Sequence, residues 1–330
     1  MMDTLVARYA EQLREALQIG AAATIRKHTS PIRNIYVSGL GGSGIGANFV
    51  AEFIKDECKL PFQVGKCYDI PKYINKHTLV MVSSYSGNTE ETLSAFDLLL
   101  QTGAKIVCIA SGGKVIARAK ELGLDYIKVP DNWPSPRACL GYSLVQQLYV
   151  LQKLKIIPSK YTKQIAKAAD LLDKEESNIR TIARKTANAL RGKMPIIYTT
   201  DRMEAVAIRF RQQVNENAKL LCWHHIVPEM NHNELVGWRD EMPDHAVVYF
   251  RNKDDFERNQ MRIEINKQVI GKYCKTILEL QSKGKSLIEK AMYFVHLGDW
   301  ISVYMAADRN VDAIEVKVID HLKNELGKVK

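Results

Sequence analysis

Residues 78–92 read TLVMVSSYSGNTEET, and they give the clearest indication of the fold. Thr78–Ser83 is an apolar, β-branched run and predicts a strand. Glu90–Gln101 has the spacing of an amphipathic helix, and it begins with two acidic residues, which the positive end of a helix dipole favours. The stretch therefore predicts a strand, a short loop and a helix, the repeating unit of a parallel α/β sheet.

The loop inside this unit is rich in hydroxyl groups. Ser84, Ser86 and Thr89 place three hydroxyls within six residues, beside Gly87 and Asn88. Serine and threonine often cap helices, and a single one would carry no further meaning. Three hydroxyls with a glycine and an asparagine exceed what capping needs, so we interpret the loop as a binding site for an anion such as phosphate.

A glycine-rich loop precedes it. Residues 37–46 read VSGLGGSGIG, between a predicted strand at Asn34–Ser38 and a predicted helix at Gly46–Lys55. Glycines let the backbone approach an anion, the helix start directs N–H groups at it, and Ser43 adds a hydroxyl. The segment also matches GxGxxG, but a dinucleotide site expects an acidic residue about 20 positions later. Gly65-Lys66 stands there instead, which disfavours a nicotinamide-dependent oxidoreductase.

Apolar runs alternate with helix-length segments along both halves, which indicates α/β architecture with two doubly wound parallel sheets. Further strands are predicted at Pro61–Val64, Lys105–Ala110, Asp125–Val129, Pro195–Thr199, Ala246–Phe250 and Thr276–Leu280. Further helices are predicted at 1–18, Lys114–Leu122, Leu140–Leu154, Arg202–Leu221, Asp254–Val269, Ser286–Ala307 and Lys317–Leu326. We expect a first domain over residues 1–154, a helical connector over 155–190 and a second domain over 191–330, with ligands at the carboxyl ends of strands.

Composition narrows the function. The chain has 330 residues, 46% hydrophobic and 25% charged, which suits two folded domains. Its formal net charge is +10, but lysine and arginine are dispersed and no nucleic-acid-binding motif accompanies them. Anionic small molecules are therefore the expected partners, rather than nucleic acid. No apolar run is long enough to span a membrane, and the N-terminus predicts an amphipathic helix rather than a signal sequence, so we expect a cytoplasmic protein.

The cysteines and histidines show no metal-site spacing. The six cysteines are scattered along the chain, which predicts buried, reduced thiols. His224 and His225 are adjacent, and adjacent side chains of an extended segment point in opposite directions. We interpret them as packing or capping residues, and expect neither a metal nor a cofactor.

Two residues of the second half stand in settings that suit acid–base chemistry. Glu216 lies between Asn215 and Asn217, which are poor helix formers, so a bend or the end of a helix is expected there. The alternative is an ordinary solvated glutamate. His232 lies in an asparagine-rich loop, and loops on a rigid scaffold often carry catalytic groups. The alternative is an ordinary surface histidine.

Together these motifs resemble one family. SSYSGNTEET resembles the hallmark of sugar isomerase (SIS) domains, and GLGGSGIG resembles bacterial and archaeal bifunctional phosphoglucose/phosphomannose isomerases. The resemblance extends over nearly the whole chain, because four further motifs occur in the family's order: PSPRACL (Pro134–Leu140), NENAK (Asn215–Lys219), PEMNHNEL (Pro228–Leu235) and IDHLK (Ile319–Lys323). It implies two tandem flavodoxin-like SIS domains, and a homodimer in which the histidine reaches across the interface.

The resemblance also implies roles for individual residues. The phosphate of a sugar phosphate would be held by Gly42, Ser43, Ser84, Ser86 and Thr89. The reacting carbons would be surrounded by Arg137, Glu216, His232 and Lys323, with Lys323 in ring opening. Without the resemblance, Arg137 could pair with an acidic helix end and Lys323 with a surface carboxylate.

The chain departs from the family in one place. Family members carry a Pro-Thr or Thr-Pro element shortly before the last helix, and its threonine borders C2 of the sugar. Residues 310–317 read NVDAIEVK, with neither residue type. The departure concerns mannose 6-phosphate, because the space around C2 decides which face of the enediol can be protonated.

The leading interpretation is an aldose–ketose isomerase of glycolysis or gluconeogenesis. It would interconvert glucose 6-phosphate and fructose 6-phosphate through a cis-enediolate, with mannose 6-phosphate as a further candidate substrate. The reaction needs a carboxylate base, an acid for ring opening and a cation near the oxyanion. The alternative is a non-catalytic SIS regulator, which would keep the Ser/Thr loops but would not need Glu216, Arg137, His232 and Lys323 together.

Overall fold

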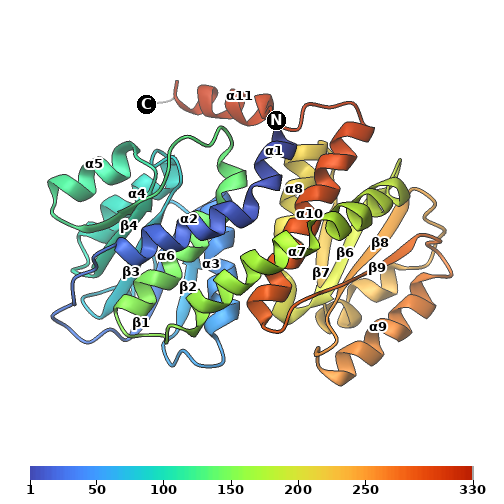
Figure 1. Cartoon of the computed structure of the whole chain (residues 1–330), viewed down its shortest axis with the longest axis horizontal. Helices are drawn as coiled ribbons and strands as arrows, with labels where there is room; N and C mark the ends of the chain where they lie inside the picture. Colours follow the sequence, from blue (N-terminus) through green and yellow to red (C-terminus); the bar gives the residue numbers. More distant parts are fainter. Residues whose placement is uncertain (329–330) are drawn as a thin grey trace. The chain divides into compact units, whose positions relative to one another are not determined.

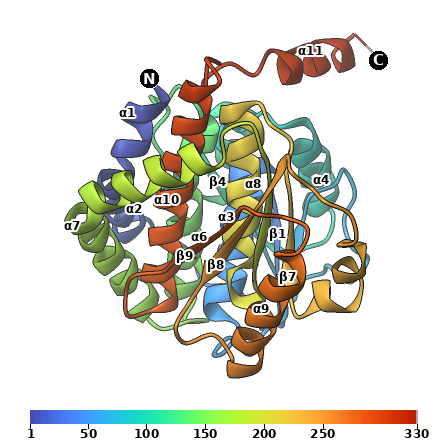
Figure 2. The same cartoon turned by 90° about the vertical axis from the view of Figure 1, so that its right-hand side faces the viewer.

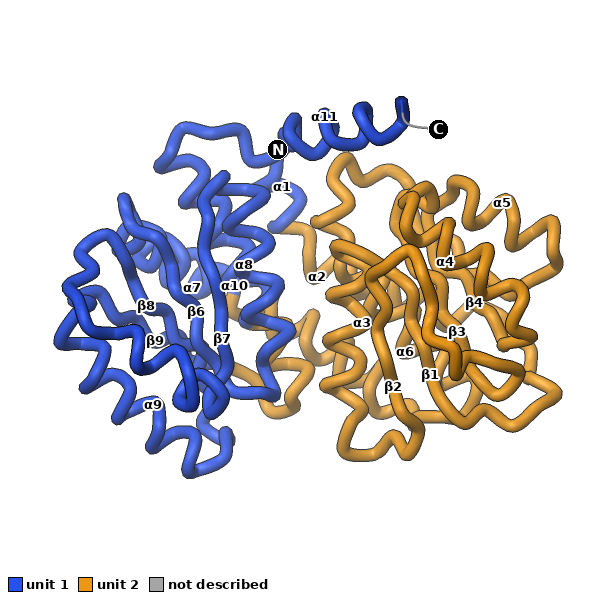
Figure 3. Tube along the Cα trace, turned by 180° about the vertical axis from the view of Figure 1, so that it is seen from behind, with its two compact units in different colours: residues 1–6, 176–282, 294–330 blue, residues 7–175, 283–293 orange. Residues whose placement is uncertain are grey.

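The computed structural model describes residues 1–328, which divide into two compact units (Figure 3). Unit 1 comprises Met1–Val6, Glu176–Ser282 and Phe294–Lys330, and unit 2 comprises Ala7–Glu175 and Lys283–Tyr293. Two long helices, α7 (Lys160–Ala189) and α10 (Leu287–Asp308), each contribute residues to both units. Neither unit is therefore one continuous stretch of chain.

The sheet of unit 2 has five parallel strands in the order β2-β1-β3-β4-β5. They are β1 (Asn34–Ser38), β2 (Phe62–Gly65), β3 (Thr78–Ser83), β4 (Lys105–Ala110) and β5 (Asp125–Lys128). All residues of β3 are buried, because this central strand is covered on both faces. Ser38 of β1 is aligned with Val82 of β3, so the loops after these two strands leave the same edge of the sheet.

Helices cover both faces of this sheet (Figure 1). On one face, α4 (Glu90–Leu100) and α5 (Gly113–Glu121) pack against β3 and β4. On the other face lie α3 (Gly41–Ile54) and α6 (Leu140–Lys153), and the Ser143 hydroxyl of α6 meets that of Ser83 at 3.1 Å. Helix α2 (Tyr9–Ala22) packs on α6, where Gln12 bonds the Ala138 carbonyl and the Gly141 N–H.

The sheet of unit 1 has four parallel strands in the order β7-β6-β8-β9. They are β6 (Met194–Thr200), β7 (Trp223–Val227), β8 (His245–Arg251) and β9 (Ile277–Gln281). In chain order this matches the first four strands of unit 2, so β6 corresponds to β1 and β8 to β3. The loops after β6 and β8 are thus the topological counterparts of the two predicted phosphate loops.

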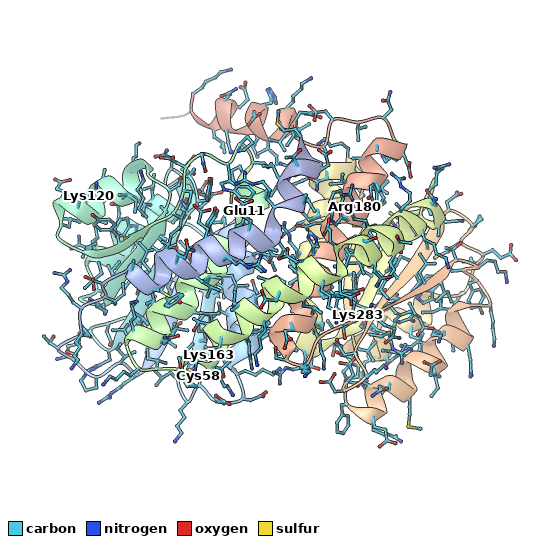
Figure 4. All side chains as sticks on the ribbon, viewed as in Figure 1. Glu11, Cys58, Lys120, Lys163, Arg180 and Lys283 are labelled. Atoms are coloured by element: carbon cyan, nitrogen blue, oxygen red, sulfur yellow. The ribbon has the colours of Figure 1, made fainter. Side chains whose placement is uncertain are left out.

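Helices also cover both faces of the unit 1 sheet (Figure 2). Helix α9 (Glu257–Ile270) packs on one face. Helices α8 (Glu204–Ala218) and α10 pack on the other, where the rings of Phe210 and Phe294 lie edge-on to Phe250. Arg180 of α7 is labelled in Figure 4. Its guanidinium carbon lies 4.3 Å from the centre of the Trp300 ring of α10. Short helices α1 (Met2–Ala7) and α11 (Lys317–Leu326) complete the unit, and every residue of α11 is exposed.

The predicted α/β class and the two doubly wound sheets are confirmed, while several element boundaries were wrong. Helix α3 begins at Gly41 instead of Gly46, and the single helix expected over residues 1–18 is two helices that meet at Arg8. That break falls where the chain passes from unit 1 to unit 2. Strand β7 was not predicted, because its Trp-His-His sequence lacks both a continuous apolar run and a clear alternation. The expectation of buried thiols fails at Cys67, which is exposed.

Candidate active site

The hydroxyl-rich loop after β3 forms a compact turn in unit 2. Ser84 is buried, and its Oγ lies 2.9 Å from Thr89 Oγ1 and accepts a hydrogen bond from the Gly87 N–H at 3.2 Å. Ser86 is exposed, and its Oγ accepts from the Asn88 N–H at 3.2 Å. Thr89 is the N-cap residue of α4, yet its side chain makes no capping bond. Simple helix capping therefore does not explain the threonine.

A third loop braces this turn. The Ser111 N–H donates to the Tyr85 carbonyl at 2.8 Å, and the Lys114 N–H donates to Asn88 Oδ1 at 3.0 Å. Gly87 has φ +68°, and a Cβ atom there would lie 2.0 Å from the Gly112 carbonyl oxygen. Residues 112–113 lie between the predicted strand Lys105–Ala110 and the predicted helix Lys114–Leu122, and no role was predicted for them. The support that they give to the hydroxyl loop is visible only in the fold.

The glycine-rich loop lies at the neighbouring strand end. Because α3 starts at Gly41, Gly42 and Ser43 belong to its first turn, and Ser43 is buried. Close packing explains the early start: a Cβ atom at Gly44 would lie 2.4 Å from the Gly39 carbonyl oxygen, and one at Gly46 would lie 2.9 Å from Ser143 Oγ. Glycine here permits close contact despite its poor helix propensity.

The structure brings these loops together with the segment that carries Arg137. A Cβ atom at Gly39 would lie 2.7 Å from the Ser83 carbonyl, so the loops after β1 and β3 are in contact. A Cβ atom at Gly42 would lie 3.4 Å from the Pro136 carbonyl, next to Arg137. Arg137 is buried in a 3₁₀ turn at Pro136–Cys139. Unit 2 therefore brings together neutral hydroxyl groups, the N-termini of α3 and α4, and the nearby turn that carries Arg137.

Glu216 lies in the last turn of α8 in unit 1, and its side chain is half-buried. The helix ends at Ala218, and the next residue, Lys219, has a left-handed φ of +54°. The Lys219 ammonium donates to the carbonyl oxygens of Glu216 at 2.5 Å and Glu315 at 2.7 Å. Asn217 is fully buried and donates to Ser302 Oγ on α10 at 2.9 Å. The backbone that carries the Glu216 carboxylate is therefore fixed on two sides.

Lys219 was not predicted to be a structural residue, since it appeared only inside the NENAK motif. A lysine directly after two asparagines at a helix end is a weak signal, because cations near helix C-termini are common. Its bond to Glu315 ties the end of α8 to residues 310–317, the stretch that departs from the family pattern. Helix α11, with Lys323, follows this stretch directly.

His232 is exposed, at the end of a 3₁₀ turn over Glu229–His232. Its loop is anchored on both sides of the histidine. Before it, Asn231 donates to Asn266 Oδ1 at 2.6 Å, and after it, the Glu234 carboxylate accepts from the Trp223 Nε1–H at 3.1 Å and from the Tyr198 hydroxyl. The imidazole therefore projects from a loop with a fixed base. Glu216, His232 and Lys323 lie on three separate elements of unit 1.

The counterpart loops of unit 1 are unsuited to phosphate. After β6 and β8, the Asp255 carboxylate accepts hydrogen bonds from Thr200 Oγ1 at 3.0 Å and from the Asn252 N–H at 3.1 Å. Burial raises the pKa of Asp255, but a carboxyl group already occupies the donors that an anion would need. Of the two corresponding loop pairs, only that of unit 2 offers a neutral set of donors.

Neither a metal-binding cluster nor a membrane-spanning helix is found in residues 1–328. Over that range, no group of three or more His, Cys, Asp or Glu side chains is placed to hold a metal ion. His224 and His225 lie in β7, where the His225 Nδ1 accepts from the Ile226 N–H at 2.8 Å. Burial lowers the pKa of His224 to about 4. No helix within the described range is long and apolar enough to cross a membrane.

Comparisons with known proteins agree with this architecture. Residues 30–157 match the SIS domain family, and residues 179–326 match the family of bacterial phospho-glucose isomerase C-terminal SIS domains. A solved structure, the C-terminal domain of glucosamine-fructose-6-phosphate aminotransferase from Francisella tularensis, has the same fold. It gives a TM-score of 0.75 at 15% identity and covers 94% of this chain and 97% of that chain.

Two curated relatives are similar over nearly their whole lengths. A bifunctional phosphoglucose/phosphomannose isomerase from Caldicellulosiruptor bescii is 35% identical, covering 97% of this chain and 97% of the relative. One of the same name from Aquifex aeolicus is 34% identical, covering 92% of this chain and 93% of the relative. With an SIS domain matched in each half, the chain belongs to the bifunctional phosphoglucose/phosphomannose isomerase family.

Proposed function

We propose that this protein interconverts glucose 6-phosphate, fructose 6-phosphate and mannose 6-phosphate, with Glu216 as the proton-transferring base. The observation that carries the assignment is a half-buried carboxylate on a helix end whose backbone is fixed by Lys219 and Asn217. A base must be held within reach of the proton that it removes. The names of the relatives support this choice of substrates.

The chemistry requires one proton to move between neighbouring carbons. The Glu216 carboxylate removes the C2 proton of the open-chain aldose, and the electron pair forms a cis-enediolate with charge on the C1 oxygen. A proton passes from the C2 hydroxyl to the C1 oxygen, and the Glu216 carboxylic acid returns a proton to C1, which gives the ketose and restores the carboxylate. Return to either face of C2 from the ketose gives glucose 6-phosphate or mannose 6-phosphate. No oxidant or reductant enters this balance.

The phosphate is assigned to the loops of unit 2. Ser84, Ser86 and Thr89 supply hydroxyls, and Gly42 and Ser43 lie in the first turn of α3. A helix start directs N–H groups and its positive dipole end toward an anion. The neutral character of this set suits a dianion that must also be released.

The reaction also needs a cation near the oxyanion and groups for ring opening, and we assign three further residues to these roles. Arg137, buried next to the α3 start, would stabilise the enediolate charge. His232 and Lys323 are exposed and would act in ring opening. We propose a homodimer in which His232 serves the partner's site, because a histidine that projects from an anchored loop is available to a second chain. We further propose that the protein works in the cytoplasm, in glycolysis or gluconeogenesis.

The test is the Glu216→Gln variant, which preserves volume but removes the proton acceptor. We expect sugar-phosphate binding close to wild type and a kcat lowered by about 10²–10⁴-fold. Glu204→Gln, at the other end of the same helix, is the matched control and should keep its activity. A sugar-phosphate-binding regulator would show no turnover in any form, and full activity in Glu216→Gln would refute the assignment.

Isotope incorporation tests the proton transfer itself. Wild-type protein in D₂O should place deuterium at C2 of the glucose 6-phosphate formed from fructose 6-phosphate, because an enediolate base exchanges its proton with solvent. A direct hydride shift would leave C2 unlabelled. The same NMR spectra report mannose 6-phosphate. Its absence at equilibrium would restrict the activity to glucose 6-phosphate, as the missing Pro-Thr element in residues 310–317 suggests.

A further inference from the structure

A cavity of about 380 Å³ lies in unit 2, away from the phosphate loops. Its walls come from residues 27–32, Leu60 and residues 153–156. Residues 27–32 precede β1 and Leu60 precedes β2, so the cavity lies at the amino-terminal end of the sheet. The phosphate loops lie at the carboxyl-terminal end, separated by the five residues of β1, or roughly 17 Å.

The cavity is strongly basic. Lys27, His28, Lys153 and Lys155 line it, and no acidic residue does. Lys153 donates to the Ala21 carbonyl at 3.0 Å, which leaves two of its three N–H donors for other partners. Over residues 1–328, neither Lys27 nor Lys155 forms an ion pair with a carboxylate. Gathering three ammonium groups without a counter-charge is unfavourable, and a multiply charged anion would offset it.

The C-terminal end of α6 lies beside the cavity, and a lysine at that end offsets the negative pole of the helix. Lys153 is the last residue of α6, and a cation there complements the negative end of the helix dipole. That effect accounts for a lysine on α6 but not for Lys27, which comes from a different segment. The last carbonyls of α6 are also occupied, because those of residues 150–152 accept from the N–H groups of residues 154–156.

The remaining walls are apolar. Ile32, Leu60, Leu154 and Ile156 line the cavity beside the lysines, and all four are only partly buried. The volume is within the range of roughly 300–1,000 Å³ typical of small-molecule sites, which are mostly apolar with a few placed polar groups. A purely inorganic anion would use the lysines and leave these side chains in contact with water.

We propose that this cavity binds an organic polyanion, with its charged groups on the lysines and its apolar or planar portion on the aliphatic side chains. Nucleoside diphosphates and triphosphates are the metabolite class that combines these two parts. The site is distinct from the sugar-phosphate site, since it lies at the opposite end of the sheet and shares none of its residues.

Isothermal titration calorimetry of the full-length protein tests this, with ADP and inorganic pyrophosphate as probes and without divalent cations. Saturating fructose 6-phosphate is present throughout, so that the phosphate loops are occupied. We expect one ADP per chain, bound more tightly than pyrophosphate, and the same ADP affinity in the Ser84→Ala, Ser86→Ala double variant.

The charge is removed by Lys27→Gln and Lys155→Gly. Lys155 has φ +60°, a conformation that glycine adopts without strain, so Lys155→Gly should fold at least as stably as wild type. Each variant should weaken ADP binding about tenfold or more, and neither should change kcat or KM for fructose 6-phosphate. Lys72→Gln, an exposed lysine of the same unit outside the cavity, is the matched control and should bind ADP as wild type does.

Three results would each overturn the assignment. One is no saturable ADP binding to wild-type protein. Another is ADP binding that Ser84→Ala, Ser86→Ala abolishes while Lys27→Gln with Lys155→Gly leaves it intact. The third is equal affinity for pyrophosphate and ADP, which would show that the aliphatic walls contribute nothing.

Discussion

Ser84 illustrates how one buried hydroxyl can organise a loop. Its Oγ contacts Thr89 Oγ1 and the Gly87 N–H, so the three groups share one hydrogen-bonded set at the end of β3. An incoming phosphate can replace these internal bonds with shorter, charge-assisted ones. The loop can therefore stay ordered when it is empty and still gain contacts on binding.

The Ser84→Ala, Ser86→Ala double variant should lose phosphate affinity. Each bond between a hydroxyl and a charged group contributes about 1.5–3 kcal/mol, so KM for fructose 6-phosphate should rise by at least about tenfold per residue. Steady-state kinetics with circular dichroism as a check of folding measures this. Ser94→Ala, one turn into α4, is the control and should leave KM unchanged. An unchanged KM in a folded double variant would place the phosphate elsewhere.

His224 should make the folded protein sensitive to acid. Burial lowers its pKa to about 4 from an ordinary 6.5, and its Nδ1 lacks a hydrogen-bond partner among the described residues. Between these two pH values the unfolded chain binds a proton that the folded chain does not. Stability is therefore lost as pH falls from about 6.5 to about 4, by up to about 3 kcal/mol.

The His224→Gln variant should remove this part of the pH dependence. Urea unfolding at pH 7 and pH 4.5 should show a smaller stability difference for His224→Gln than for wild type. His321→Gln, on exposed α11, should behave as wild type. Identical pH dependence in His224→Gln and wild type would show that His224 is protonated in the folded state.

At the scale of elements, the hydroxyl loop depends on a neighbouring loop. Gly87 combines a left-handed φ with close contact to the Gly112 carbonyl, so no side chain fits there. Gly123 has a similar φ of +61° but nothing within 4 Å of a Cβ atom. A side chain at Gly123 would therefore cost only the unfavourable backbone conformation, whereas a side chain at Gly87 would add a steric clash.

We expect Gly123→Ala to lower the free energy of unfolding by about 1 kcal/mol, the conformational cost alone. Gly87→Ala should cost more and should also raise KM for fructose 6-phosphate, because the loop must move away from Gly112. Denaturant unfolding together with kinetics distinguishes the two effects. Equal stability loss and wild-type KM in both variants would contradict the bracing role.

Sequence patterns predicted those elements that have strong local signals. Strand β1, strand β3 and helix α11 have the predicted boundaries, and residues 78–92 form the predicted unit. The predicted start of α3 was wrong because Gly44 and Gly46 allow close packing against residues 39 and 143, and no local sequence rule reveals that contact. The helix predicted over Arg202–Leu221 ends at Ala218, and Asn217, a poor helix former, stays inside it because it has a buried partner in Ser302. Contacts between distant segments decided both cases.

The same limit applies to the candidate site. Ser84, Ser86 and Thr89 were predicted as phosphate ligands from their density in one turn, and the structure places the Arg137 segment near the neighbouring loop through Gly42 and Pro136. The contributions of Lys219 and of the Gly112 loop depend on their partners in the fold. The roles assigned to Glu216, His232 and Lys323 stay predictions until the variants are measured.

At the scale of the whole molecule, the proposed homodimer makes a prediction about mixtures. If His232 serves the partner's site, inactive Glu216→Gln and inactive His232→Ala chains together form one good site per mixed dimer. Random exchange should then restore about a quarter of wild-type activity. Activity assays after co-refolding, with subunit exchange followed by mass-tagged chains, measure this. Exchange without recovery of activity would mean that each site lies within one chain.

Unit 2 is completed by residues far along the chain. Tyr9 of α2 donates its hydroxyl to Met292 Sδ at 3.1 Å, and Lys283–Tyr293 belongs to the same unit as Ala7–Glu175. On a ribosome that adds about 5–20 residues per second, the last piece of this unit emerges roughly 10 s after Glu175. During that interval the nascent first half exposes the surface that Met292 later covers. The protein therefore has a vectorial order of assembly, in which unit 2 is begun first but is completed only when most of unit 1 has been translated.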